Sequence, residues 1–133
     1  MIRFPTRRLS TIAVAALAAA MFAACGGSGS GSTGPGGGTV VVAASAGTTP
    51  NYTWSGPTAI TIDVVRASSP SVAVWEISSP MSRNIPSGTQ HGAPPPAGAQ
   101  ITANTEPVLT VGIKYRVTVA LIDGTSGSVD FTP

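Results

Sequence analysis

Cysteine and histidine are almost absent from this chain of 133 residues, which contains one of each, Cys25 and His91. A single cysteine cannot close an internal disulfide, so the fold must be held together by its core. One cysteine and one histidine also cannot supply a tetrahedral zinc site, and no D-x-D-x-D-G loop for calcium is present. We therefore expect no metal and no cofactor.

Charged side chains are scarce as well, at 9% of the sequence, and they are unevenly placed. The formal net charge of +2 depends on Arg3, Arg7 and Arg8 near the start of the chain. After Cys25 there are four basic side chains against five acidic ones, which leaves a balance of one negative charge. No cluster of Lys and Arg remains to neutralise phosphates. We expect no nucleic-acid partner.

The signatures of a catalytic centre are also missing. The sequence has no nucleophile-elbow G-x-S-x-G motif, and His91 lies in Gln-His-Gly-Ala-Pro-Pro-Pro with no nucleophile or orienting acid beside it. We expect His91 to be exposed at the end of a strand. Asp63 and Glu76 are expected to face each other on adjacent strands, an arrangement that glycosidases use, but on a solvated face. The sequence predicts a protein that is not an enzyme.

No apolar run is long enough for an ordinary membrane span. The longest, residues 12–24 (IAVAALAAAMFAA), follows three arginines and ends at Cys25. A transmembrane helix needs about 20 apolar residues, whereas a shorter run behind a positive flank is typical of an export signal. We expect residues 1–24 to be a signal peptide.

The residues Phe22-Ala23-Ala24-Cys25 resemble the lipobox of bacterial lipoproteins, with small side chains at the two positions before the cysteine. In that family a diacylglycerol is attached to the cysteine sulfur and the signal is cut just before it. The resemblance implies lipid attachment at Cys25, with a membrane as partner. An Asp directly after the lipidated cysteine resembles an inner-membrane retention signal. This chain has Gly26 at that position, so we expect the lipid to anchor the protein in the outer membrane. The alternative is an ordinary signal peptide in which Cys25 is incidental.

The segment that follows is built from glycine and serine. Residues 26–38 (GGSGSGSTGPGGG) contain no side chain able to build a core, so they are predicted to form flexible coil. A coil of this length has a root-mean-square reach of about 20 Å. We expect residues 25–38 to tether a folded domain that occupies residues 39–133.

The rest of the chain predicts strands, because Gly and Pro recur every few residues and the apolar runs are short and β-branched. A further strand is expected within residues 84–91, since an unstructured connection over 80–98 would be unusually long. About seven to eight strands predict an all-β, antiparallel sandwich. The other predicted strands are residues 39–44, 51–55, 59–66, 71–78, 114–122 and 128–132.

Alternation along three of these strands predicts which side chains share a face. In 59–66 it places Ile60 on the same face as Ile62 and Val64, and in 71–78 it places Val74 on the face opposite Trp75. In 114–122 one face is made of Tyr115, Val117, Val119 and Leu121.

One segment, LTVGIKYRVTV from Leu109 onward, resembles the corner between the E and F strands of fibronectin type III domains. There a Leu precedes a Tyr by six residues, with a turn Gly between them, and Leu109, Gly112 and Tyr115 have that spacing. The resemblance implies that the Tyr115 hydroxyl bonds back to upstream backbone. It also implies a core position for Trp54 on the second strand. We expect an immunoglobulin-like sandwich, and more specifically a fibronectin type III-like one.

Two functions remain open. The first is a non-catalytic interaction or structural module, displayed from the cell envelope, with a protein partner or the envelope itself. The second is a carbohydrate-binding module in which Trp75 and Tyr52 stack on a sugar ring. They differ in the exposure of Trp75, because a buried ring is simply part of the core. The run Pro94–Pro96 is either a rigid connection or a polyproline ligand for an aromatic groove.

Overall fold

The computed structural model describes residues 40–79, 81 and 85–133. The signal peptide and tether predicted for residues 1–38, with Cys25, lie outside these residues. The described part contains eight strands and no helix. The strands are β1 (Val42–Ala44), β2 (Asn51–Trp54), β3 (Ala59–Arg66), β4 (Ser69–Ser78), β5 (Thr89–Gln90), β6 (Gln100–Asn104), β7 (Tyr115–Leu121) and β8 (Ser126–Phe131).

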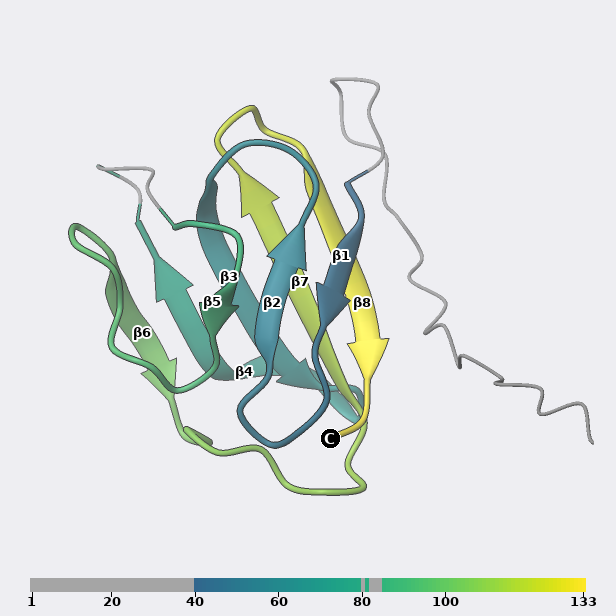
Figure 1. Ribbon diagram of the computed structural model, residues 1–133. Coiled ribbons are helices and arrows are strands. Elements are labelled where there is room, and N and C mark those ends of the chain that lie inside the picture. Colours follow the sequence, from purple (N-terminus) through teal and green to yellow (C-terminus); the bar gives the residue numbers. More distant parts are fainter. Residues whose placement is uncertain (1–39, 80, 82–84) are drawn as a thin grey trace, which may run out of the picture.

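The strands form two sheets that lie in two layers (Figure 1). One sheet has three strands in the order β1-β2-β5, and the other has five in the order β6-β4-β3-β7-β8. All the strand pairings are antiparallel. The all-β, antiparallel, two-layer architecture predicted from the sequence is confirmed.

The core lies between the sheets, and β7 shows how the sequence places it. Tyr115, Val117, Val119 and Leu121 alternate along β7 and all four are buried, as the pattern predicted. They pack against the buried side chains of β3, which pairs with β7 along its length. Burying each of the three aliphatic side chains contributes about 1.5–3 kcal/mol, so the core supplies the stability that disulfides give to other small domains.

A bulge in β4 changes the pattern that simple alternation predicts. Trp75 pairs with Val64 and Ala73 pairs with Val65, so Val74 is an extra residue between them. Alternation placed Val74 on the opposite face from Trp75, and that expectation is wrong, because the bulge buries both side chains. The Val74 carbonyl accepts the backbone N–H groups of Thr105 and Glu106 at 2.9 and 3.1 Å.

A second irregularity lies at the start of β3. Ala59 pairs with Leu121 and Thr61 with Ala120, so Ile60 is the extra residue. The sequence pattern placed Ile60 on the core face, whereas Ala59 occupies that position and Ile60 is only partly buried. Both irregularities arise from strand pairing, which the alternation of one strand cannot reveal.

The strand β6 was not predicted. It lies at the edge of the five-stranded sheet, where Ile101 packs against the core. The remaining residues of β6 are polar or small, so the strand carries little hydrophobic pattern. Its pairing with β4 shifts register between Ile101 and Ala103, which leaves Thr102 as an extra residue. A bulge of this kind discourages an edge strand from pairing with other chains.

The strand expected within residues 84–91 is present but short. It consists of β5, preceded by a single bridge between Ile85 and Ala59. Because β5 pairs with β2 and β6 pairs with β4, the residues between them pass from one sheet to the other (Figure 1).

Candidate functional site

The expectation that His91 is exposed is wrong, because its side chain is 1% exposed. Gln90 pairs with Asn51, and the His91 backbone N–H continues this ladder by donating to the Pro50 carbonyl at 2.9 Å. Side chains alternate along paired strands, so His91 points to the same side as the buried Tyr52 and Pro50.

Both ring nitrogens of His91 have hydrogen-bond partners, and the partners define its protonation. Nε2 lies 2.7 Å from the Glu106 carbonyl oxygen, which can only accept, so Nε2 carries the hydrogen. Nδ1 lies 2.9 Å from the Tyr52 hydroxyl, and in the neutral ring it accepts that hydrogen bond. Burial lowers the pKa of His91, and it outweighs the opposing effects of the hydrogen bond to Glu106 and of the Glu106 charge.

Trp75 and Tyr52, the two candidate sugar-binding residues, surround this histidine. The ring centroids of Trp75 and His91 are 4.7 Å apart, and those of Tyr52 and Trp75 are 6.0 Å apart. Both side chains are 0% exposed, so neither ring presents a face to a sugar. The condition for a carbohydrate-stacking platform is therefore not met in this structure. Burial, followed by the interaction with Tyr115, raises the pKa of Tyr52.

Glu106 links the histidine to a second group of polar side chains. Its Oε1 accepts from Arg66 Nε at 2.6 Å, and its Oε2 accepts from the Tyr115 hydroxyl at 2.6 Å. Burial alone would raise the pKa of Glu106, but the hydrogen bonds from Arg66 and Tyr115 outweigh it and leave the pKa below its usual value. The carboxylate is therefore ionised and paired at neutral pH.

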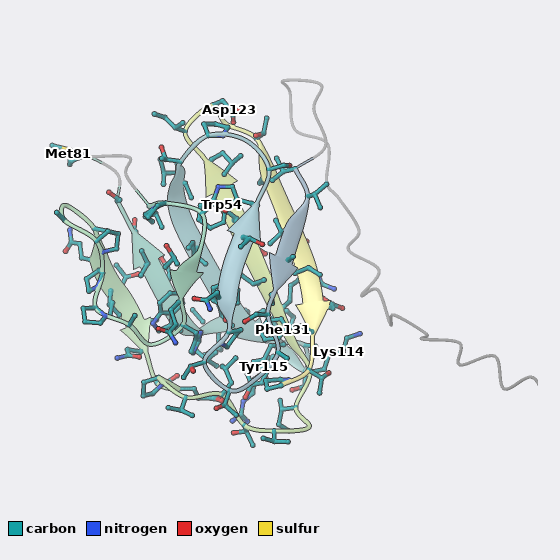
Figure 2. The ribbon with its side chains drawn as sticks, in the orientation of Figure 1. Trp54, Met81, Lys114, Tyr115, Asp123 and Phe131 are labelled. Carbon is teal, nitrogen blue, oxygen red and sulfur yellow. The ribbon has the colours of Figure 1, made fainter. Side chains whose placement is uncertain are left out.

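The predicted corner residues Leu109, Gly112 and Tyr115 lie together at one end of the sandwich. Leu109 is buried, and Gly112 has a φ of +80°, a backbone conformation that favours glycine. The Tyr115 hydroxyl accepts the backbone N–H of Thr110 at 3.1 Å, which is the upstream contact that the corner resemblance implies. The Tyr115 ring stacks on Phe131 with centroids 6.0 Å apart (Figure 2).

Asp63 and Glu76 occupy paired positions on β3 and β4, as expected, and both are partly buried. Burial, followed by the charge of Glu76, raises the pKa of Asp63. One carboxylate oxygen of Asp63 is buried with no hydrogen-bond partner among the described residues. In this part of the chain no group of three or more His, Cys, Asp or Glu side chains is placed to hold a metal ion.

The strongest candidate site is therefore a buried group that we name the His91 cluster, made of Tyr52, Trp75, His91 and Glu106. Sequence reasoning missed Glu106 and the burial of His91. The one sequence signal for the burial of His91 was its position at the end of an expected strand. Whether its side chain faces the core or the solvent depends on how β5 pairs with β2, which the sequence does not specify. The cluster has no open face to a substrate, but it contains a histidine whose pKa is lowered by burial.

In comparisons with known proteins, no family model, curated protein or solved structure matches the chain. In the described ranges no helix is long and apolar enough to cross a membrane.

Proposed function

We propose that this protein is a non-catalytic interaction or structural module, held at the bacterial cell envelope by a lipid on Cys25 and displayed on the tether of residues 25–38. The observation that supports an interaction or structural module is the burial of the aromatic side chains. Tyr52, Trp54, Trp75 and Tyr115 are all buried between the sheets. Since these rings serve the core, the module acts through its sheet faces, strand edges or loops.

A fibronectin type III-like fold is the finer part of this proposal. The order β1-β2-β5 corresponds to strands A, B and E, and the order β3-β7-β8 corresponds to C, F and G, with β4 as C′. The Tyr115–Thr110 hydrogen bond and the buried Trp54 on β2 support the assignment. The edge strand β6 has no counterpart in this scheme.

The outer face of the five-stranded sheet is the contact surface that we propose. Neighbouring positions on β3, β7 and β8 carry Asp63, Thr118 and Ser128, which are side chains of short reach. The other sheet covers only the opposite face (Figure 1). Such a sheet face presents hydrogen-bonding groups over a wide area and does not enclose a small ligand. We therefore propose that its partner is a macromolecule.

Anchoring is tested by replacing the lipid-accepting residue in the full chain. Cys25→Ala is expected to abolish labelling by a fatty-acid precursor and to release the protein from the membrane fraction, because the sulfur that carries the diacylglycerol is gone. Ser28→Ala is the matched control and is expected to remain labelled and membrane-bound. A Cys25→Ala protein that is still labelled and still sediments with membranes contradicts the proposed anchor.

Module function is tested in cells by placing a photo-reactive amino acid at Thr118, with the exposed Thr53 on the other sheet as control. Cross-links to an envelope protein at position 118, weaker or absent at position 53, support the proposal. If neither position cross-links and the chain instead binds peptidoglycan or another insoluble polysaccharide, the carbohydrate-binding alternative replaces it.

A further inference from the structure

The residues between β5 and β6 pass from one sheet to the other at one side of the sandwich, and the first of them, His91, lies against Trp75 (Figure 1). We name residues 91–99 the crossover, because they lead from the three-stranded sheet to the five-stranded sheet (Figure 1). The crossover begins with His91, whose ring lies 4.7 Å from the Trp75 ring and 5.9 Å from the Tyr52 ring. Two fully buried aromatic side chains, Trp75 and Tyr52, therefore pack against a titratable group.

His91 supplies three hydrogen bonds that join the crossover to the rest of the domain. Its backbone N–H donates to Pro50, its Nε2–H donates to the Glu106 carbonyl, and its Nδ1 accepts from Tyr52. The next residue, Gly92, lies so close to Pro107 that a Cβ added there would be 2.2 Å from the Pro107 carbonyl oxygen. The beginning of the crossover is thus seated closely against the segment that follows β6.

Few hydrogen bonds hold the middle of the crossover to the other described residues. Pro94, Pro95 and Pro96 have no backbone N–H and donate no backbone hydrogen bond. The Ala99 N–H bonds to the Pro96 carbonyl, which is inside the crossover itself. At the far end, the Ser79 hydroxyl donates to the Gly98 carbonyl at 3.2 Å and Ala99 packs against the core. The contacts of His91, with the close packing of Gly92 on Pro107, therefore hold the first half of the crossover.

Protonation of His91 converts Nδ1 from an acceptor to a donor. The Nδ1–H then donates to the Tyr52 hydroxyl oxygen, so that the hydroxyl hydrogen loses its acceptor, and a positive charge is placed in a buried site. The groups that face His91 are the Tyr52 hydroxyl from β2, the uncharged Trp75 from β4 and Glu106 from the segment after β6. Glu106 presents its backbone carbonyl to the imidazole, while its carboxylate is bonded to Arg66 and Tyr115. No carboxylate oxygen among the described residues hydrogen-bonds the imidazolium.

We propose that His91 is a pH-sensitive latch: its protonation at Nδ1 releases the crossover and exposes Trp75 and Tyr52 to solvent while the paired strands of both sheets remain folded. The Trp75 Nε1 is buried with no hydrogen-bond partner in the described part of the chain, so exposure of this indole to water would satisfy a donor that the closed state leaves unpaired. This device is independent of the module function and of the lipid anchor proposed above.

The lowered pKa of His91 gives the direction of the switch. The open state has the ordinary pKa of 6.5 and binds the proton more tightly than the closed state. The closed state is therefore fully stabilised above pH 6.5 and loses stability as the pH falls from there toward the lower pKa. Over that interval the opening equilibrium rises about tenfold for each pH unit.

The experiment is an NMR titration of the full chain in detergent from pH 7.5 to pH 4.5, with hydrogen exchange measured at each pH. His91 is the single histidine, so its imidazole signals need no mutant for assignment. We expect the protection factors of the Trp75 indole N–H and of the crossover amides to fall as the imidazole titrates. The amides of β3 and β7 are expected to stay protected. The Trp54 indole, bonded to the Pro57 carbonyl at 2.9 Å, is an internal reference that is expected not to change.

A variant separates the latch from general acid sensitivity. His91→Gln keeps a side-chain N–H for the Glu106 carbonyl but does not titrate, so its crossover protection is expected to be independent of pH. Gln90→Ala, at the exposed neighbouring residue, is the control and is expected to keep the pH dependence of the parent chain.

Three results overturn the proposal. The crossover amides keep their protection from hydrogen exchange while the imidazole titrates, or the imidazole does not titrate above pH 4.5. In the third, the amides of β3 and β7 lose protection together with the crossover. Each is read from the parent chain, so the decision stands even if His91→Gln does not fold.

Discussion

At the scale of single residues, the Tyr115 hydroxyl is the clearest example of one atom that makes two tertiary contacts. It accepts from the Thr110 N–H and donates to Glu106 Oε2, so it ties the start of β7 to two points of the connection between β6 and β7. The spacing of Leu109, Gly112 and Tyr115 suggested the first contact, and nothing in the sequence suggested the second.

Tyr115→Phe is expected to lower the free energy of unfolding by about 1–2 kcal/mol, because it leaves the Thr110 N–H and a Glu106 oxygen without their partner while it preserves the ring. Urea unfolding measures the change. Thr53→Val, which removes an exposed hydroxyl from β2, is the control and is expected to change stability little. Equal losses in the two variants would mean that the corner hydroxyl has no special role.

At the scale of strands, the close approach of β1 and β8 depends on a missing side chain. A Cβ added to Gly127 on β8 would lie 2.5 Å from the Val40 carbonyl oxygen and 3.0 Å from the Val40 Cβ. The position needs a glycine for space, because a backbone atom rather than a flexible side-chain end occupies the volume.

Gly127→Ala is expected to cost about 1–3 kcal/mol, since β1 must move away from β8 to admit the methyl group. Thermal unfolding measures the loss, and hydrogen exchange is expected to locate it in β1. Ser128→Ala, the next residue on β8, is the matched control. Unchanged exchange in β1 would show that the two strands are less tightly packed than this structure has them.

Strands also show where sequence patterns succeed and where they fail. The alternation along β7 predicted its buried face correctly, because that strand pairs regularly with β3 and β8. Val74 and Ile60 were assigned to the wrong faces because each is an extra residue in a paired strand. The edge strand β6 gave almost no signal, since it buries little of its surface.

At the scale of the whole molecule, the ionisable groups act in opposite directions on stability. Stability is expected to fall as the pH drops below 6.5, because the unfolded chain binds a proton at His91 more readily than the folded chain does. Glu106 and Asp130 have lowered pKa values, so their contributions are lost at lower pH, as each carboxylate becomes protonated in the folded state. Asp63, whose pKa is raised, has the opposite sign and partly offsets this second loss.

Urea unfolding between pH 8 and pH 3 is expected to show two declines, the first below pH 6.5 and the second below about pH 4.5, the ordinary value for a glutamate. In His91→Gln the first decline is expected to disappear and the second to remain. Two declines of unchanged size in that variant would assign the first to a group other than His91.

The sequence by itself determined the class of the fold. Short β-branched runs between glycines and prolines left no route to helices, and a chain with one cysteine had to bury apolar side chains between two sheets. The corner contact of Tyr115 and the core position of Trp54 were implied by the resemblance of the local sequence to fibronectin type III domains. The export signal, the lipid on Cys25 and the tether are likewise predictions of the sequence, and they concern residues outside the described structure.

Only the tertiary structure decided which polar groups meet. His91, Tyr52, Trp75 and Glu106 come from four separate segments, and no local pattern specifies that the ring nitrogens of His91 find a hydroxyl on β2 and a carbonyl after β6. The physical reason is that a buried polar group is placed by its partners, and those partners are fixed by strand register and bulges rather than by hydrophobic periodicity.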